Sequence, residues 1–291
     1  MSDQPKHIKF QNRTNPGSGY DMLRLEDLFK RSEMDHSPFN LHRVEFYMIL
    51  LITGGAGKHT VDFTKYNCQR GTILTIRKDQ LQKFHQSNLE GTILIFTNDF
   101  LVSYLEELEA LRSIQLFNEV IAAPNFQLDE KNIMEILSSC KRISKEYFDI
   151  NDAHSLGIIR SELHILISKL FRLKSKSDPK VYDRKYLSEF IEFQRLVEQK
   201  ASISTKVKDY AKMMGLSPKT LNNITRAILD KSAKAFVDEI CTKQIKRLLI
   251  NTTLSIKEIA YETGFEETTN FYKYFKRQTQ LTPEAFRQKN R

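Results

Sequence analysis

The sequence contains no tryptophan, only three cysteines and no long apolar run. Its longest uninterrupted apolar run covers residues 46–52, far short of the ~18 residues that a membrane-spanning helix needs. The first residues lack the apolar core of a signal peptide. Cys68, Cys140 and Cys241 are far apart and have no Cys or His at metal-ligand spacing, so we expect packing thiols. These absences predict a soluble, cytoplasmic protein with no disulfide, no structural metal and no cofactor.

Positive charge is concentrated in the second part of the chain. The 291 residues include 45 Lys and Arg against 36 Asp and Glu, a net charge of +9, and the length suits about two domains. Residues 1–179 hold 23 basic and 23 acidic residues, so the whole excess lies in residues 180–291. A basic domain attracts phosphate polyanions, but basic surfaces also serve solubility alone. Charge therefore permits a nucleic-acid partner without establishing one.

The first part of the chain changes from strand-like to helical patterns. Short alternating runs separated by Gly and polar turns predict a small antiparallel barrel or sandwich, and later periodic runs predict helices. Lys, Ser, Asp and Pro then replace the apolar periodicity, which predicts domains at 1–173 and 181–291 with a linker at 174–180. The expected strands are 45–53, 58–63, 72–76, 81–84 and 92–96, and the expected helices are 98–105, 130–147 and 154–173.

The last of these helices carries leucines and isoleucines at alternating spacings of three and four residues. This spacing places them on one stripe, as at the seam between two packed helices. Two interpretations remain open: a core helix of its own domain, or a seam with a second copy of the chain. The stripe consists of Leu156, Ile159, Leu163, Leu166, Leu170 and Leu173, of which the first five are the candidate dimer residues.

A structural repeat is present in the basic part. Residues 210–217 and 259–266 share Ala four positions before Gly, with an apolar residue following the Gly. The small Ala (Ala211, Ala260) permits a close helix crossing, and the Gly (Gly215, Gly264) permits the left-handed backbone that ends a helix. The repeat predicts two helix-turn-helix units.

The second helix of each unit has a polar, cationic outer face. In the first unit Leu221, Ile224 and Ile228 form the inner stripe, and in the second Phe271, Tyr274, Phe275 and Gln278 mark the inner side. Asn amides suit adenine edges, and Lys and Arg suit guanine or phosphates. The predicted DNA-binding residues are Lys219, Asn222, Asn223 and Arg226 of the first unit, and Thr269, Lys273 and Lys276 of the second, with Tyr272 and Arg277 flanking them and Thr268 at the helix start.

A long helix is expected between the two units. Residues 233–251 would span about 28 Å at ~1.5 Å per residue. Successive major grooves on one face of B-DNA lie about 34 Å apart. The spacing predicts that one chain can place both units in adjacent grooves.

The segment LSIKEIAYETGFEETTNFYKYFKRQTQLTPEAFR, residues 254–287, resembles the signature of the AraC/XylS family of bacterial transcription regulators. The resemblance extends back to about residue 182 and implies a seven-helix DNA-binding domain. It also implies that base-reading residues fall at Lys219, Asn222, Asn223, Thr268, Thr269, Tyr272 and Lys273. The sequence departs from the family pattern at Asn223, often Arg, at Cys241 and Ile245, often Arg and Ala, and at Gln280, usually Gly.

The first domain resembles the cupin-like barrels that often precede this DNA-binding domain. The metal-binding pattern of cupins is broken, because Val44 stands where a second His is expected and Gln82 where a later one is. We therefore expect no metal centre. By analogy of fold, Phe39, His42, Glu45 and Tyr47 are candidates for lining a small-molecule site.

These observations together predict an α+β protein: a cupin-like β-barrel followed by helices, then an all-α domain with two helix-turn-helix units joined by a linker helix. The predicted function is sequence-specific regulation of transcription, not catalysis. The expected partners are promoter DNA, a small-molecule effector, a second copy of the chain and, for an activator, RNA polymerase. Two alternatives remain: a metal-dependent cupin enzyme with a DNA-binding anchor, and a protein-interaction module with nonspecific nucleic-acid binding.

Overall fold

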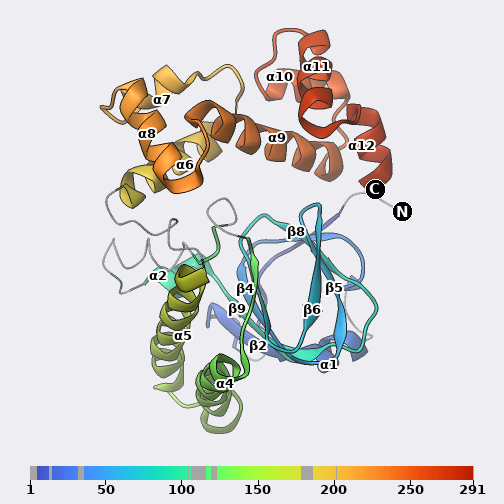
Figure 1. Cartoon of the computed structure of the whole chain (residues 1–291). Helices are drawn as coiled ribbons and strands as arrows, with labels where there is room; N and C mark the ends of the chain where they lie inside the picture. The colour runs from blue at the N-terminus through green and yellow to red at the C-terminus, as the bar shows by residue number, and fades with distance from the viewer. Residues whose placement is uncertain are drawn as a thin grey trace. The chain divides into compact units, whose positions relative to one another are not determined.

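A computed structural model describes residues 5–12, 15–31, 36–103, 105, 116–118, 123–177, 186–200 and 202–290. The chain divides into two compact units, Pro5–Ser177 and Asp178–Arg291. The first contains strands followed by helices, and the second is helical (Figure 1). The predicted α+β class is confirmed. No helix among the described residues is long and apolar enough to cross a membrane.

Two five-stranded sheets form the first unit. Both sheets are antiparallel except for the parallel pair β1–β3. The sequence patterns identified β7 and β8 at their observed limits and missed β1, β2, β3, β6 and β10. One sheet has the order β1 (Lys6–Ile8), β3 (His42–Val44), β8 (Leu81–Phe84), β5 (Ala56–Val61), β6 (Thr64–Gln69). The other has the order β10 (Asn125–Gln127), β7 (Thr72–Ile76), β4 (Tyr47–Gly54), β9 (Glu90–Phe96), β2 (Tyr20–Arg24).

Strand β4 is apolar on both faces because both faces are covered. Successive side chains of a strand point to opposite sides. Met48 and Leu50 therefore belong to the core between the sheets, which also contains Phe84. Ile49 and Leu51 belong to a second core, on the side where the helices pack. This double burial explains the apolar run at residues 46–52.

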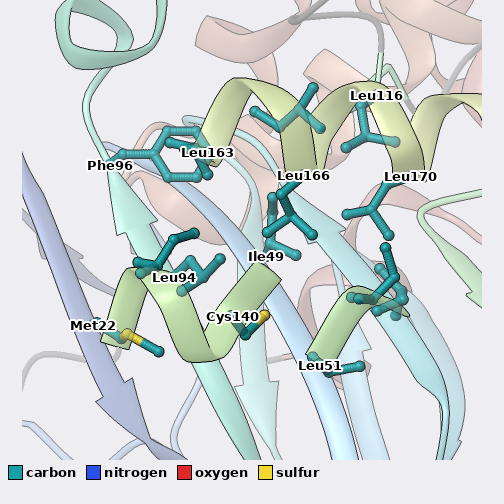
Figure 2. Close-up of a cluster of buried hydrophobic side chains, with 14 of the residues drawn as sticks. Met22, Ile49, Leu51, Leu94, Phe96, Leu116, Cys140, Leu163, Leu166 and Leu170 are labelled. Carbon is teal, nitrogen blue, oxygen red and sulfur yellow. The ribbon is translucent and has the colours of Figure 1, made fainter. Parts of the chain in front are cut away.

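Helix α1 (Leu25–Lys30) contributes Leu25 and Leu28 to the core between the sheets. The second core is closed by α2 (Asn98–Val102), α4 (Glu130–Ser144), the π-helical turn η1 (Lys145–Ile150) and α5 (Ser155–Ser177). Figure 2 shows Leu163, Leu166 and Leu170 of α5 directed at the sheet residues Ile49, Leu51 and Leu94.

The structure supports the first of the two interpretations of the α5 stripe, a core stripe of its own domain. Ile159, Leu163, Leu166 and Leu170 are each at most 1% exposed, and Leu156 packs against the same core. The sheet on one side and α4 on the other already supply the apolar partner that a helix seam requires. The spacing identified a buried face correctly but could not identify what covers it.

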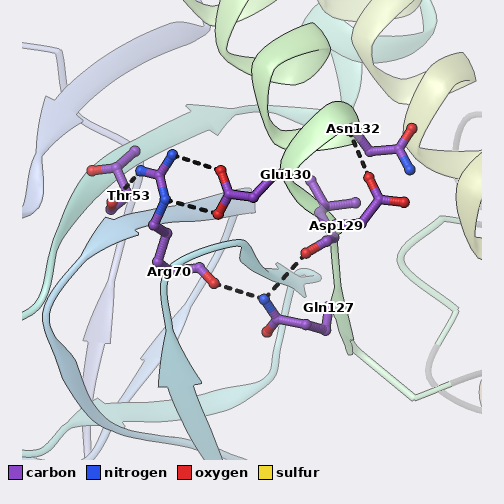
Figure 3. A network of polar contacts seen from close by, with 7 residues as sticks. Thr53, Arg70, Gln127, Asp129, Glu130 and Asn132 are labelled. Atoms are coloured by element: carbon purple, nitrogen blue, oxygen red, sulfur yellow. Dashed lines mark hydrogen bonds and ion pairs between the residues drawn. The ribbon is translucent and has the colours of Figure 1, made fainter.

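A polar network joins the turn between β6 and β7 to the start of α4 (Figure 3). The Arg70 guanidinium donates to both carboxylate oxygens of Glu130 at 3.1 Å and to the Thr53 carbonyl at 2.9 Å. The Gln127 amide donates to the Arg70 carbonyl at 2.6 Å. Asp129 caps α4 by accepting the Asn132 N–H at 2.8 Å. These bonds fix where α4 begins on the sheet.

The predicted linker at 174–180 begins too early. Helix α5 continues to Ser177, while residues 178–180 lie outside the described part of the chain. Lys174 is only 5% exposed, and its ammonium donates to the Leu116 carbonyl at 3.2 Å. Burial lowers the pKa of Lys174 to about 8. The sequence pattern predicts the linker from 174 because Lys is usually exposed, whereas Lys174 is buried and hydrogen-bonded inside the domain.

In the part of the second unit that the structure describes there are seven helices. The central helix α9 contacts α6, α7 and α8 of the first half and α10 and α12 of the second. Phe190, Phe193 and Phe236 pack together in the first half, with ring centroids 5.2 Å apart for Phe190–Phe236 and Phe193–Phe236. Phe265, Phe271, Phe275 and Phe286 form the equivalent cluster in the second. The helices are α6 (Leu187–Lys200), α7 (Val207–Met213), α8 (Pro218–Leu229), α9 (Ala233–Asn251), α10 (Ile256–Glu262), α11 (Thr268–Thr279) and α12 (Pro283–Asn290).

Candidate nucleic-acid interface and internal cavity

The two turns of the second unit have the same hydrogen-bonded geometry. The Leu216 N–H donates to the Ala211 carbonyl at 2.8 Å, and the equivalent Phe265 N–H donates to the Ala260 carbonyl at 2.9 Å. The intervening glycines both have a left-handed backbone, with φ of +65° at Gly215 and +86° at Gly264. These positions are the ones at which the sequence required Gly. The helix pairs α7–α8 and α10–α11 are therefore two copies of one helix-turn-helix unit.

Helix α8 presents the predicted polar face to solvent. Ser217 caps its start by accepting the Thr220 N–H at 3.0 Å, and Pro218 occupies the first turn. Leu221, Ile224 and Ile228 are buried as expected. On the opposite side Lys219, Asn223 and Arg226 are exposed.

Asn222 differs from its neighbours on α8 because it is half-buried and already bonded. Its amide oxygen accepts the N–H of Ala233, the first residue of α9, at 3.1 Å. The first N–H groups of a helix need acceptors from outside the helix. Bidentate pairing with adenine uses both the oxygen and the nitrogen of an amide. The Asn222 oxygen already accepts one hydrogen bond within the fold, so we favour Asn223, whose amide is exposed, for the adenine contact.

Helix α11 presents a second polar face. Phe271, Tyr274 and Phe275 are buried, whereas Gln278 is exposed and does not belong to the inner side as expected. Because α11 ends at Thr279, Gln278 lies in its last turn, beyond the buried aromatic cluster. The outward residues Thr269, Lys273, Lys276 and Arg277 are exposed, and Thr268 and Tyr272 are half-buried.

Tyr272 is tied to the following helix. Its hydroxyl donates to the Glu284 carboxylate in the first turn of α12. This hydrogen bond raises the pKa of Tyr272 to about 12. The phenol is therefore neutral at physiological pH and is held in a fixed orientation beside Lys273 on the outer face.

The linker helix has the predicted length, and both of its ends are fixed. Helix α9 has 19 residues, or about 28 Å at ~1.5 Å per residue. Ser232 caps its start by accepting the Ala235 N–H at 3.1 Å. Near its end, the Arg287 guanidinium donates to the carbonyls of Leu249 at 2.9 Å and Leu254 at 2.7 Å. A capped helix of this length can hold two units at a fixed spacing.

The first unit contains a cavity of about 860 Å³ on the side where β1 and β2 are the edge strands of the two sheets. Its apolar lining includes the core residues Val44, Met48 and Phe84. Its polar lining includes Asp21, Asn12 and Tyr147. The Tyr147 hydroxyl donates to Asp21 at 2.6 Å, and the Asn12 amide donates to the Tyr147 oxygen at 3.0 Å. Burial raises the pKa of Asp21, although the hydrogen bond from Tyr147 acts to lower it.

Two buried histidines, one lining this cavity and one behind its wall, are held neutral. Burial lowers the pKa of His42 to about 4, and its Nδ1 lies 2.9 Å from the Asn40 carbonyl. Behind the wall, burial lowers the pKa of His59 to about 3, and its Nε2 lies 3.1 Å from the Gln82 amide oxygen. Nδ1 of His42 therefore carries the proton, because a carbonyl can only accept.

Of the four predicted lining residues, only His42 lines the cavity. Tyr47 stacks on Phe96, with ring centroids 6.0 Å apart, and belongs to the core on the helix side. Tyr47 lies on the same face of β4 as Ile49 and Leu51, which point away from the core between the two sheets. Phe39 packs on Phe29 at 5.3 Å, and Glu45 is not part of the lining. Lys6, Lys9, Phe10 and Asn12 also line the cavity but were not predicted, because the three-residue strand β1 and the coil that follows it give no alternation long enough to detect.

Two helix-turn-helix units on one rod-like helix, together with a cavity-bearing β-domain, define a transcription regulator with a ligand-binding domain and a DNA-binding domain. Residues 27–166 match the AraC-like ligand binding domain, and residues 210–289 match a helix-turn-helix domain. The chain belongs to the AraC/XylS family of transcription regulators.

Individual relatives are distant but cover most of the chain. The Msm operon regulatory protein of Streptococcus mutans is 24% identical over 83% of this chain and 84% of its own length. The transcriptional activator RhaR of an Enterobacter species is 20% identical over 93% of this chain and 97% of its own. The crystal structure of ToxT from Vibrio cholerae is 14% identical, with a TM-score of 0.45, over 94% of this chain and 98% of its own.

Proposed function

We propose that the outer faces of α8 and α11 read base edges in adjacent major grooves of one promoter site. The observation that carries the proposal is the repeated turn geometry, which gives both helices the same presentation. Lys219, Asn223 and Arg226 on α8, and Thr269, Lys273 and Lys276 on α11, are exposed on these faces. Residues near the start of a recognition helix contact bases, and cations further along contact phosphates.

The remaining partners follow from the domain organisation. We assign the cavity of the first unit to a small-molecule effector, which regulates DNA binding by preferring one of two states of the protein. If α5 also contributes to a homodimer, its outer side offers Ile158 and Ile165, which are 43% and 45% exposed and seven residues apart. RhaR is a transcriptional activator, and an activating role here implies contact with RNA polymerase. The proposal is of a cytoplasmic regulator without catalytic activity.

The test compares Lys273→Ala with Lys276→Ala on a selected duplex and on random duplex DNA. Lys273→Ala is expected to cost about 1–3 kcal/mol on the selected duplex and little on random DNA, because a base contact carries the preference. Lys276→Ala is expected to weaken both alike and to reduce the salt slope by about 1, because a phosphate contact carries none. Equal losses of affinity on both duplexes for both variants would contradict the assignment of Lys273 to a base contact and Lys276 to a phosphate contact.

A further inference from the structure

The sheet β1–β3–β8–β5–β6 has an outer face that is basic, although its domain as a whole is neutral. In β5 and β8, His59, Gln82 and Phe84 point into the domain, as their contacts at the cavity wall show. Strand alternation therefore places Lys58 and Lys83 on the outside. Lys65 of β6 belongs to the same side, because Thr60 of β5 is paired with Lys65 on one edge and with Lys83 on the other. Figure 1 shows these three strands side by side.

His85 completes this face, defined here as the basic face of Lys58, Lys65, Lys83 and His85. Its Nε2 lies 2.8 Å from the Thr60 hydroxyl. The pKa of His85 is lowered by burial and by the positive charges of Lys65, Lys83 and Lys58, so all three ammonium groups act on one imidazole. The three lysines therefore share one electrostatic field.

This concentration of like charge is not neutralised within the domain. Among the residues that the structure describes, no carboxylate forms an ion pair with Lys58, Lys65 or Lys83. No two of these lysines are directly paired, but like charges about 10 Å apart still repel each other. Elsewhere on the same domain the cations of Arg70 and Arg142 are paired with Glu130 and Glu162. An external polyanion would relieve this repulsion.

We propose that the basic face binds the phosphate backbone of duplex DNA outside the site read by α8 and α11. This inference rests on the proposed function, since the sequence-reading unit brings the tethered first unit to the duplex and raises the local phosphate concentration. Lys65 and Lys83 lie on either side of β5, two strand spacings or about 10 Å apart. One DNA strand carries a phosphate every ~3.4 Å along the axis, so this distance covers about three.

The experiment uses the full chain, a duplex that just covers the selected site, and the same site extended by about two helical turns, or ~20 base pairs, on each side. The variant carries Lys58→Gln, Lys65→Gln and Lys83→Gln. On the extended duplex its affinity is expected to fall about tenfold or more, and its salt slope by about 2–3, because each lost phosphate contact removes ~0.9. On the short duplex it is expected to equal the native chain.

A matched control removes three exposed lysines from the helical side of the same domain. Lys131→Gln, Lys141→Gln and Lys145→Gln on α4 and η1 change the net charge equally and are expected to leave the extended duplex bound as by the native chain. Equal losses for the two triple variants would overturn the proposal, because net charge alone would explain them. An unchanged affinity of the first variant would also overturn it.

Two further outcomes separate failure of this proposal from failure of the proposed function. If the native chain bound phosphatidylserine vesicles and the first variant did not, while both bound DNA equally, the basic face would bind a lipid surface. That result would overturn the proposal. A native chain that prefers no sequence over random duplex would instead defeat the proposed function itself. Thermal unfolding of both triple variants is expected to match that of the native chain, since all six side chains lie on the surface.

Discussion

Asn222 and Asn223 are adjacent on α8 and carry the same side chain in different surroundings. The Asn222 oxygen accepts the first N–H of α9, whereas Asn223 is exposed on the outer face. An amide oxygen at a helix start replaces water as the acceptor for a group that the helix cannot satisfy. At the scale of single residues, one asparagine therefore serves the fold and the other is available to DNA.

We predict opposite consequences for the two substitutions to alanine. Asn222→Ala should lower the free energy of unfolding by about 1 kcal/mol, because α9 loses an acceptor at its start. Asn223→Ala should change stability by less than about 0.5 kcal/mol but reduce sequence preference by about 1–3 kcal/mol at its base position. Denaturant unfolding and competition binding measure the two effects. Stability loss only at Asn223 would reverse the assignment.

Residue types alone could not separate these two roles. Helical periodicity placed Lys219, Asn223 and Arg226 correctly on the outer face, since burial of Leu221 and Ile224 fixes the opposite side. It could not detect that the loop after α8 brings the start of α9 back to Asn222, because that contact joins positions 11 residues apart. The glycines of the two turns were predictable, because left-handed backbone has a direct sequence requirement.

At the scale of elements, α5 shows what a stripe of apolar residues can and cannot tell. The spacing of Ile159, Leu163 and Leu166 predicted one buried face, and the structure buries all three. The sequence offered a second copy and the domain's own core as equal explanations. The sheet distinguishes the two explanations, because Ile49 and Leu51 of β4 are apolar on the side away from the barrel interior and pack against α5. The element that buries an apolar stripe is therefore determined by the topology of the fold and not by the spacing of the stripe.

We predict that Leu166→Ala destabilises the first unit by about 2–5 kcal/mol without changing the oligomeric state, because it opens a cavity in that unit's own core. The double variant Ile158→Ser with Ile165→Ser should alter stability by less than about 1 kcal/mol, since both side chains are largely exposed. Denaturant unfolding and sedimentation provide the measurements. If Leu166→Ala changed the oligomer mass in sedimentation and left the free energy of unfolding unaffected, the stripe would be a dimer seam.

At the scale of the whole molecule, charge is distributed by function rather than evenly. The excess of nine positive charges lies in residues 180–291, which contain both helix-turn-helix units. The first domain is neutral in sum, yet Lys58, Lys65 and Lys83 lie together on the outer face of one sheet. Net charge was readable from the sequence, but this clustering was not, because it depends on the register between β5, β6 and β8.

We propose that one chain reads two adjacent grooves through two equivalent helices. The decisive experiment is selection of bound fragments from random duplex DNA with the native chain and with Asn223→Ala and Lys273→Ala. We expect two enriched blocks with centres about 10–10.5 base pairs apart, one altered by each variant. Enrichment of no sequence, or a loss confined to the same block in both variants, would contradict the claim.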